Sequence, residues 1–210
     1  MKLALVSLVL ALALSACSRE RQLVPGGVYL TRTGCPQVAI PGATGDITLF
    51  SPTGRTDSAA IDVVATITNL RSTCSEDAAN VVSTATFDVV ASRRDASEAR
   101  QVVLPFYSVA VQGGSDVVAK KVGAVALNFP AGGVRAQTNS QSIVRVARGA
   151  VALPEDVRRE LQRERKPGDA DAAIDPLSDP KIREAVARAT FEHLVGFQLS
   201  PDQLRYNATR

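Results

Sequence analysis

The sequence predicts a mainly β protein, an antiparallel β-sandwich followed by a C-terminal helical extension. Two observations support this prediction. Between residues 28 and 147, short runs rich in Val, Ile and Thr alternate apolar and polar positions, and Gly, Pro, Asn and Asp separate them. From Leu153 onward the chain becomes charged, and its apolar residues recur at helical spacing.

Short alternating segments with the pattern of half-buried strands occupy most of the first 150 residues. Ile61, Val63 and Ala65, for example, fall on one face of an extended chain, so that face should be buried. Pro105 predicts an edge position or a bulge, because proline donates no hydrogen bond to a neighbouring strand. The expected strands are residues 28–33, 46–50, 61–70, 81–93, 101–111, 117–129 and 142–147.

The composition agrees with this interpretation. The chain is 45% hydrophobic and has no Trp, six Phe and three Tyr, so its core should consist mainly of Val, Ala, Leu and Ile. The number and spacing of the strands resemble those of immunoglobulin-like sandwiches. This resemblance implies two antiparallel sheets packed face to face, in a domain spanning residues 28–153.

Residues 154–210 are expected to form the helical extension. Pro154 suits the first turn of a helix over 154–166, and residues 167–178 are interpreted as a linker. A second helix should begin at Asp179 and Pro180, with Ile182, Val186, Ala189 and His193 on one face. Ser200 and Gln203 match a capping box for a last short turn. This extension is expected to be dispensable to the fold.

The N-terminus has the features of an export signal. Lys2 precedes an apolar run over residues 3–14, which is shorter than the roughly 20 residues that a membrane-spanning helix needs. The run ends in Leu14-Ser15-Ala16-Cys17, which resembles the lipobox of bacterial lipoprotein precursors. The alternative is an ordinary cleaved signal peptide with a chance cysteine.

The lipobox resemblance implies a signal peptide over residues 1–16, cleavage before Cys17, and acyl chains such as palmitate on Cys17. Two or three acyl chains anchor a protein stably in a membrane. Residues 17–27 would then form a tether. Because Ser18 stands where an Asp would resemble an inner-membrane retention signal, the outer membrane, facing the periplasm, is favoured.

With Cys17 lipidated, Cys35 and Cys74 remain in an oxidising compartment. A structural disulfide between them is the expected outcome. A reactive thiol or a metal pair is the alternative, although the spacing is not that of a C-x-x-C motif and the chain has a single histidine.

Catalytic and metal-binding motifs are scarce in the sequence. His193 is interpreted as a partly buried structural histidine, and no G-x-S-x-G nucleophile motif accompanies it. Asp169, Asp171 and Asp175 suggest a calcium loop. Such a loop requires an oxygen ligand where Ala173 stands and a glycine where Ile174 stands, so a solvated linker is favoured. No enzyme activity, metal or cofactor is therefore expected, although two carboxylates that meet only in the fold stay an open alternative. The formal charge of +3 and the lack of a long basic run make nucleic acid an unexpected partner.

The sequence favours a lipid-anchored, non-catalytic envelope protein that binds an envelope protein partner or supports envelope assembly. One candidate partner site is the helix at 154–166, which carries Arg158, Arg159, Arg163 and Arg165. The alternative for this helix is an exposed surface of salt bridges. The alternative function is a periplasm-facing carrier or sensor of a small apolar ligand.

Overall fold

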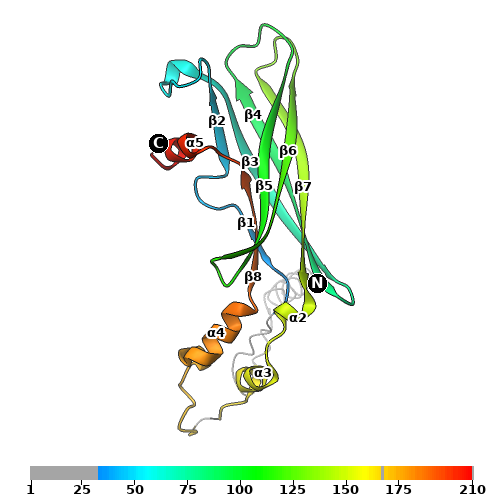
Figure 1. Ribbon diagram of the computed structural model, residues 1–210, viewed down its shortest axis with the longest axis vertical. Coiled ribbons are helices and arrows are strands. Elements are labelled where there is room, and N and C mark those ends of the chain that lie inside the picture. The colour runs from blue at the N-terminus through cyan, green and yellow to red at the C-terminus, as the bar shows by residue number, and fades with distance from the viewer. Residues whose placement is uncertain (1–32, 167, 210) are drawn as a thin grey trace, which may run out of the picture. The chain divides into compact units, whose positions relative to one another are not determined.

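The computed structural model describes residues 33–166 and 168–209, which include a β-sandwich of two sheets (Figure 1). The larger of two units contains Arg32–Leu161 and Asp175–Arg210, and Gln162–Ile174 belong to the smaller unit. Cys17, the tether and residues 28–32 of the first expected strand lie outside the described residues. The predicted fold class, a mainly β sandwich, is confirmed.

Both sheets of the described region have four strands. The first has the order β1-β8-β5-β6 and consists of β1 (Gln37–Ala39), β8 (Phe191–Phe197), β5 (Arg100–Gln112) and β6 (Asp116–Phe129). The second has the order β2-β3-β4-β7 and consists of β2 (Asp46–Phe50), β3 (Ile61–Glu76), β4 (Asn80–Arg93) and β7 (Arg135–Ala147). Neighbouring strands pair antiparallel except β1 and β8, which are parallel.

The structure corrects the expectation that the sandwich ends before residue 154. β8 pairs with β5 from Phe106–Phe197 to Gln112–Phe191, so it is an inner strand of the first sheet. Val195 and Phe197 are fully buried. The predicted second helix therefore ends at Arg188 and does not reach His193. Residues 191–197 are instead extended, because they are buried as a strand paired with β5.

Pro105 occupies an inner strand rather than the expected edge. The β5–β8 register begins at Phe106, and the Pro105 carbonyl accepts from the Gln198 amide just beyond β8. In a strand, the nitrogen and carbonyl of one residue point to the same side. The proline nitrogen, which has no hydrogen to donate, therefore points towards the residues beyond the end of β8. No hydrogen bond between β5 and β8 is lost.

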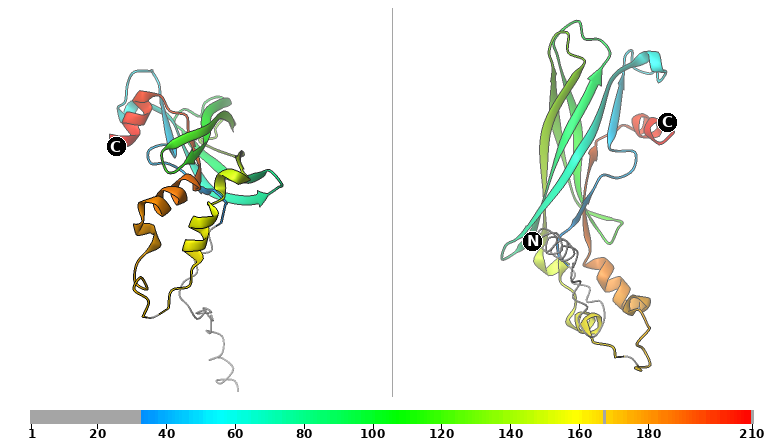
Figure 2. Two further views of the ribbon diagram at one scale, coloured as in Figure 1. Left: turned by 60° about the horizontal axis from the view of Figure 1, so that its bottom comes forward. Right: turned by 180° about the vertical axis from the view of Figure 1, so that it is seen from behind.

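The helices are short: α2 (Arg148–Val151), α3 (Glu155–Gln162), α4 (Pro180–Arg188) and α5 (Pro201–Thr209). The Asp179 carboxylate accepts from the Lys181 amide, and Ser200 and Gln203 form the expected capping box. α3 and α4 lie side by side (Figure 2) and bury Val157, Ile182 and Ala185 in a small core of their own. Within residues 33–166 and 168–209, every helix is too short or too polar to span a membrane.

The sandwich interior contains two apolar clusters with a polar layer between them. The main cluster includes Phe87, Phe106, Phe129 and Phe197, and a second contains Ala110, Val144, Val146 and Phe191. Along β5, Ser108 separates Phe106 from Ala110, and along β8 His193 separates Phe191 from Val195. This polar layer is the most unusual chemistry in the core.

Candidate functional site

His193 lies at the centre of the polar layer and has no solvent exposure. Its Nδ1 is 3.0 Å from the Ser83 hydroxyl on β4. Its Nε2 is 3.0 Å from the Ser108 hydroxyl on β5 and 2.9 Å from the Ser142 hydroxyl on β7. Four strands from both sheets thus bring three hydroxyls onto one imidazole.

Burial lowers the pKa of His193 from 6.5 to about 4, because a charged imidazolium loses its hydration inside the sandwich. The imidazole is therefore neutral at neutral pH. A neutral ring has one N–H donor and one acceptor nitrogen, and the surrounding hydroxyls can serve either tautomer. The polar layer is hydrogen-bonded without a buried charge.

The cluster differs from a hydrolytic triad at its third member. In a triad, a carboxylate on Nδ1 orients the imidazole and stabilises its protonated form. Here the Ser83 hydroxyl takes that position, and a histidine with a pKa of about 4 is a weak base at neutral pH. The arrangement can orient hydroxyl groups, but it is poorly suited to removing a proton from them.

A groove with a volume of about 340 Å³ lies between the edge strands β6 and β7 and reaches this cluster. Its buried lining residues include Ser108 and Ser142, the two hydroxyls on His193 Nε2. Its exposed lining residues include Lys121 and Arg145. We call this depression the β6–β7 groove. It connects the buried polar layer with cationic side chains at the surface.

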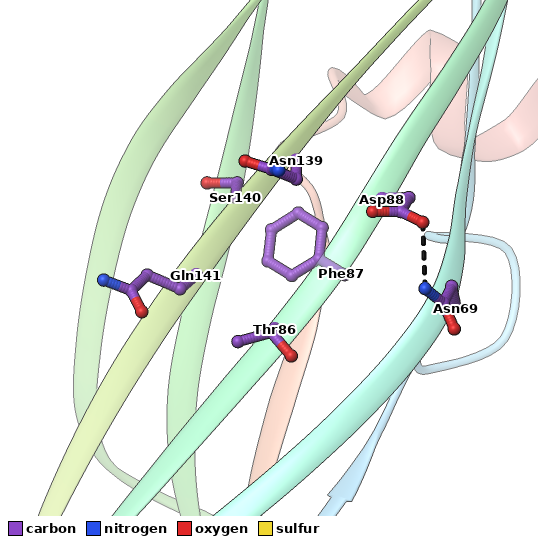
Figure 3. Close-up of a pocket in the computed structure, with 7 residues that line it drawn as sticks. All are labelled: Asn69, Thr86, Phe87, Asp88, Asn139, Ser140 and Gln141. Carbon is purple, nitrogen blue, oxygen red and sulfur yellow. Dashed lines mark hydrogen bonds between the residues drawn. The ribbon is translucent and has the colours of Figure 1, made fainter.

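The outer face of the second sheet has two further depressions, of about 600 and 620 Å³. Figure 3 shows the first, where the Asn69 amide donates to the Asp88 carboxylate at 2.9 Å. Asn69 has a φ of 51° at the register shift between Thr68 and Arg71, and Arg71 donates to its side-chain oxygen. The polar groups nearest the bulge already bond one another.

The outer face of the first sheet is apolar and exposed over three consecutive cross-strand pairs of β5 and β6. These pairs are Val103 with Ala126, Pro105 with Ala124, and Tyr107 with Val122. Val103 and Val122 are 56% and 60% exposed. We call these six residues the β5–β6 patch.

The expected disulfide between Cys35 and Cys74 is present, with the two Cα atoms 6.0 Å apart. Cys35 precedes β1 of the first sheet, and Cys74 lies in β3 of the second. The disulfide therefore links the two sheets covalently. It accounts for both cysteines of the chain other than Cys17.

The structure does not place the four candidate arginines on one helix. α3 ends at Gln162, so the predicted helix over 154–166 is too long, and Arg163 and Arg165 belong to the smaller unit. Arg158 and Arg159 pair with Glu155, while Arg163 and Arg165 pair with Asp171. The exposed pairs of Arg158 and Arg159 with Glu155 agree with the alternative of an exposed helix with salt bridges. Arg163 and Arg165, in contrast, lie beyond the helix, and the Arg165 side chain is 15% exposed.

Sequence reasoning missed the serines around His193 and the cations of the groove. Ser83, Ser108 and Ser142 each occupy a buried, inward position of a strand. Ser83 and Ser108 lie between inward apolar residues that are themselves buried, whereas Ser142 is followed by buried Val144 and preceded on the same face by Ser140. A serine at an inward position was the available signal. Which serines would meet one histidine depends on pairing between distant strands.

Comparison with known proteins gives no match to a family model, a curated protein or a solved structure.

Proposed function

We propose that this chain is a lipid-anchored, non-catalytic protein of the bacterial cell envelope that binds an envelope protein partner through the β5–β6 patch. The exposed apolar patch is the observation that carries the proposal. Support for envelope assembly would follow from the same binding.

The composition of the patch favours a protein partner. Its six residues are all apolar or aromatic, and the next cross-strand pair, Gln101 with Asn128, provides a hydrogen-bonded polar rim. Lys120 lies over the Tyr107 ring, 5.7 Å from its centre. Contiguous exposed apolar surface with an aromatic residue and a polar rim is typical of protein interfaces.

The surroundings of His193 support the non-catalytic part of the proposal. The imidazole is buried and bonded by hydroxyls, with Ser83 where a triad would place a carboxylate. The β6–β7 groove favours a second candidate function, the binding of a small ligand, because Phe106 and Ile143 give it apolar walls.

The anchor is supported by the lipobox sequence that ends at Cys17. In bacterial cells that process lipoproteins, the full-length chain should incorporate labelled fatty acid and sediment with membranes. Cys17→Ala should abolish both lipid labelling and processing, because the thiol is the attachment point. A mature N-terminus elsewhere than Cys17, on protein without lipid, would contradict the anchor.

Partner binding is tested by site-specific photocrosslinking in intact cells. A photoreactive amino acid replaces Val103 in the patch or, as a matched control, Val90, which is 36% exposed on the outer face of the second sheet. We expect a discrete adduct with one other envelope protein from position 103 and none from position 90.

Two results would overturn the assignment of the patch. Adducts of equal yield from both positions would show non-specific contact. No adduct from position 103, or an adduct consisting of two copies of this chain, would show that the patch does not bind a different protein.

A further inference from the structure

The β6–β7 groove contains buried hydroxyl groups whose hydrogen-bonding capacity the protein does not use up. Ser108 and Ser142 are 3% and 9% exposed, and both hydroxyls lie within 3.0 Å of His193 Nε2. The structure shows no second hydrogen-bond partner for either hydroxyl among residues 33–166 and 168–209.

His193 Nε2 can form a good hydrogen bond with only one hydroxyl proton, so the proton of at least one of the two serines is not donated to the ring. If Nε2 carries a hydrogen, both serine oxygens accept from it and both hydroxyl protons point elsewhere. If Nε2 carries a lone pair, it accepts one hydroxyl proton in good geometry and leaves the other. Because buried donors in folded proteins find acceptors, and both serines line the open groove, this proton is available to water or to an acceptor atom of a ligand in the groove.

The charge of the groove indicates the sign of that acceptor. Lys121 pairs directly with Ser108 across β5 and β6, so the two side chains lie on the same face. Within the described part of the chain, neither Lys121 nor Arg145 forms an ion pair. The pKa of Asp77 is lowered first by the backbone amides of Ala79 and Asn80, and the charge of Arg145 is the smallest contribution. The residues that line the groove include no acid. Hydroxyl donors and two cations together favour an oxyanion.

The remaining walls indicate what the oxyanion is attached to. Phe106 and Ile143 contribute apolar surface beside the polar groups. A volume of about 340 Å³ is at the small end of the range of ligand pockets. These features fit a short aliphatic body better than a long chain or a macromolecule.

We propose that the β6–β7 groove binds a small amphipathic oxyanion, a carboxylate or phosphate ester with a short aliphatic chain, whose head meets Ser108, Ser142, Lys121 and Arg145. This oxyanion is the ligand of the second candidate function proposed above. The groove shares only Val122 with the β5–β6 patch, and the ligand head contacts none of the patch residues. His193 is a positioning residue here, since it acts by holding the two hydroxyls.

The test uses octanoate and octyl phosphate as the two anionic probes and octanol as the neutral control. Because the chain has one histidine and both groove serines contact it, its imidazole C–H resonance in NMR spectra of the protein reports on the groove. We expect a saturable shift of this resonance with at least one of the anions and none with octanol. Which anion binds more tightly distinguishes a carboxylate from a phosphate ester.

Amino-acid substitutions test whether anion binding depends on the side chains of the groove or on apolar surface in general. Lys121→Gln with Arg145→Gln should weaken anion binding at least about tenfold, because both cations are removed. Lys120→Gln is the matched control, since Lys120 neighbours Lys121 but lies over the Tyr107 ring on the outer face. It should leave the dissociation constant within about twofold of the wild-type value. Ser142→Ala should weaken binding and shift the histidine resonance of the free protein.

Three outcomes would overturn the proposal. The first is the absence of a saturable shift with either anion up to about 10 mM. The second is equal binding of octanol, which would indicate an apolar pocket. The third is equal weakening in the Lys120→Gln control and the double variant, which would indicate non-specific attraction to positive charge.

Discussion

At the scale of residues, His193 shows how a polar side chain can occupy the interior of a sandwich. The ring is fully buried, yet both of its nitrogens have serine partners. Burying a polar group without such bonds is costly, whereas a satisfied group can separate two apolar clusters at little net cost. The serines of β4, β5 and β7 therefore explain why a histidine is tolerated in β8.

The neutral state of His193 predicts a specific pH dependence. The pKa is 6.5 when the chain is unfolded and about 4 in the folded protein, so the unfolded state binds more protons between these values. The free energy of unfolding should therefore fall as the pH falls from about 6.5 to about 4, by at most about 3 kcal/mol from this residue.

An NMR titration of the histidine C–H resonance measures this pKa directly, because the chain has one histidine. The folded protein should show no inflection near pH 6.5, while the same protein in denaturant should titrate there. A folded-state inflection near 6.5 would show that the imidazole is hydrated and that the polar layer is open to water.

At the scale of elements, β8 is the strand on which the first sheet depends. It lies between β1 and β5. The Thr44 side chain packs against Gly196 so closely that a Cβ atom at this position would lie 2.4 Å from Thr44 Oγ1, which leaves room for glycine only. Phe197 is fully buried in the main core cluster. A segment near the C-terminus thus completes a sheet whose other strands begin far earlier in the chain.

Phe197→Ala should destabilise the protein by about 3 to 5 kcal/mol, because it leaves a cavity in the core. Leu204→Ala on α5 is the control, since Leu204 is 44% exposed, and should cost less than about 0.5 kcal/mol. Denaturant unfolding of both variants measures the difference.

If Phe197→Ala and Leu204→Ala lowered the free energy of unfolding by similarly small amounts, residues 154–210 would again be interpreted as a dispensable extension. By the same argument, a chain that ends at residue 153 lacks β8 and should not unfold cooperatively.

The sequence predicted the bounds of several strands that have one buried and one solvent-exposed face. β2 and β4 to β6 begin and end within a residue of their predicted ranges, because alternation in antiparallel strands is a local signal. β3 and β7 are longer than predicted, since polar residues at their ends continue the pairing with β4. β1, with three residues, is too short to show a pattern.

β8 could not be assigned from its own residues. Phe191, His193, Val195 and Phe197 alternate inward, but His193 also continues the helical spacing of Ile182, Val186 and Ala189. Pairing with β5, which is distant in sequence, decides between the two. The β6–β7 groove escaped prediction for the same reason, because Ser108 and Ser142 meet only through His193.

At the scale of the whole molecule, the disulfide holds the two sheets together across a sequence separation of 39 residues. Replacing Cys35 and Cys74 together with serine should lower the free energy of unfolding by about 4 kcal/mol, because the unfolded chain regains the entropy of an open loop. Denaturant unfolding with and without a reductant checks this value. Free thiols at both positions in protein purified without a reductant would contradict the disulfide.

Partner binding by the β5–β6 patch is tested most directly by the dissociation constant between this protein and the partner that crosslinks from position 103. Burial of one valine contributes about 1.5 to 3 kcal/mol, and about 1.4 kcal/mol is tenfold in affinity. Val103→Asp should therefore weaken binding at least about tenfold, while Val90→Asp on the other sheet should change it less than about twofold. An unchanged dissociation constant in Val103→Asp would show that the partner binds elsewhere.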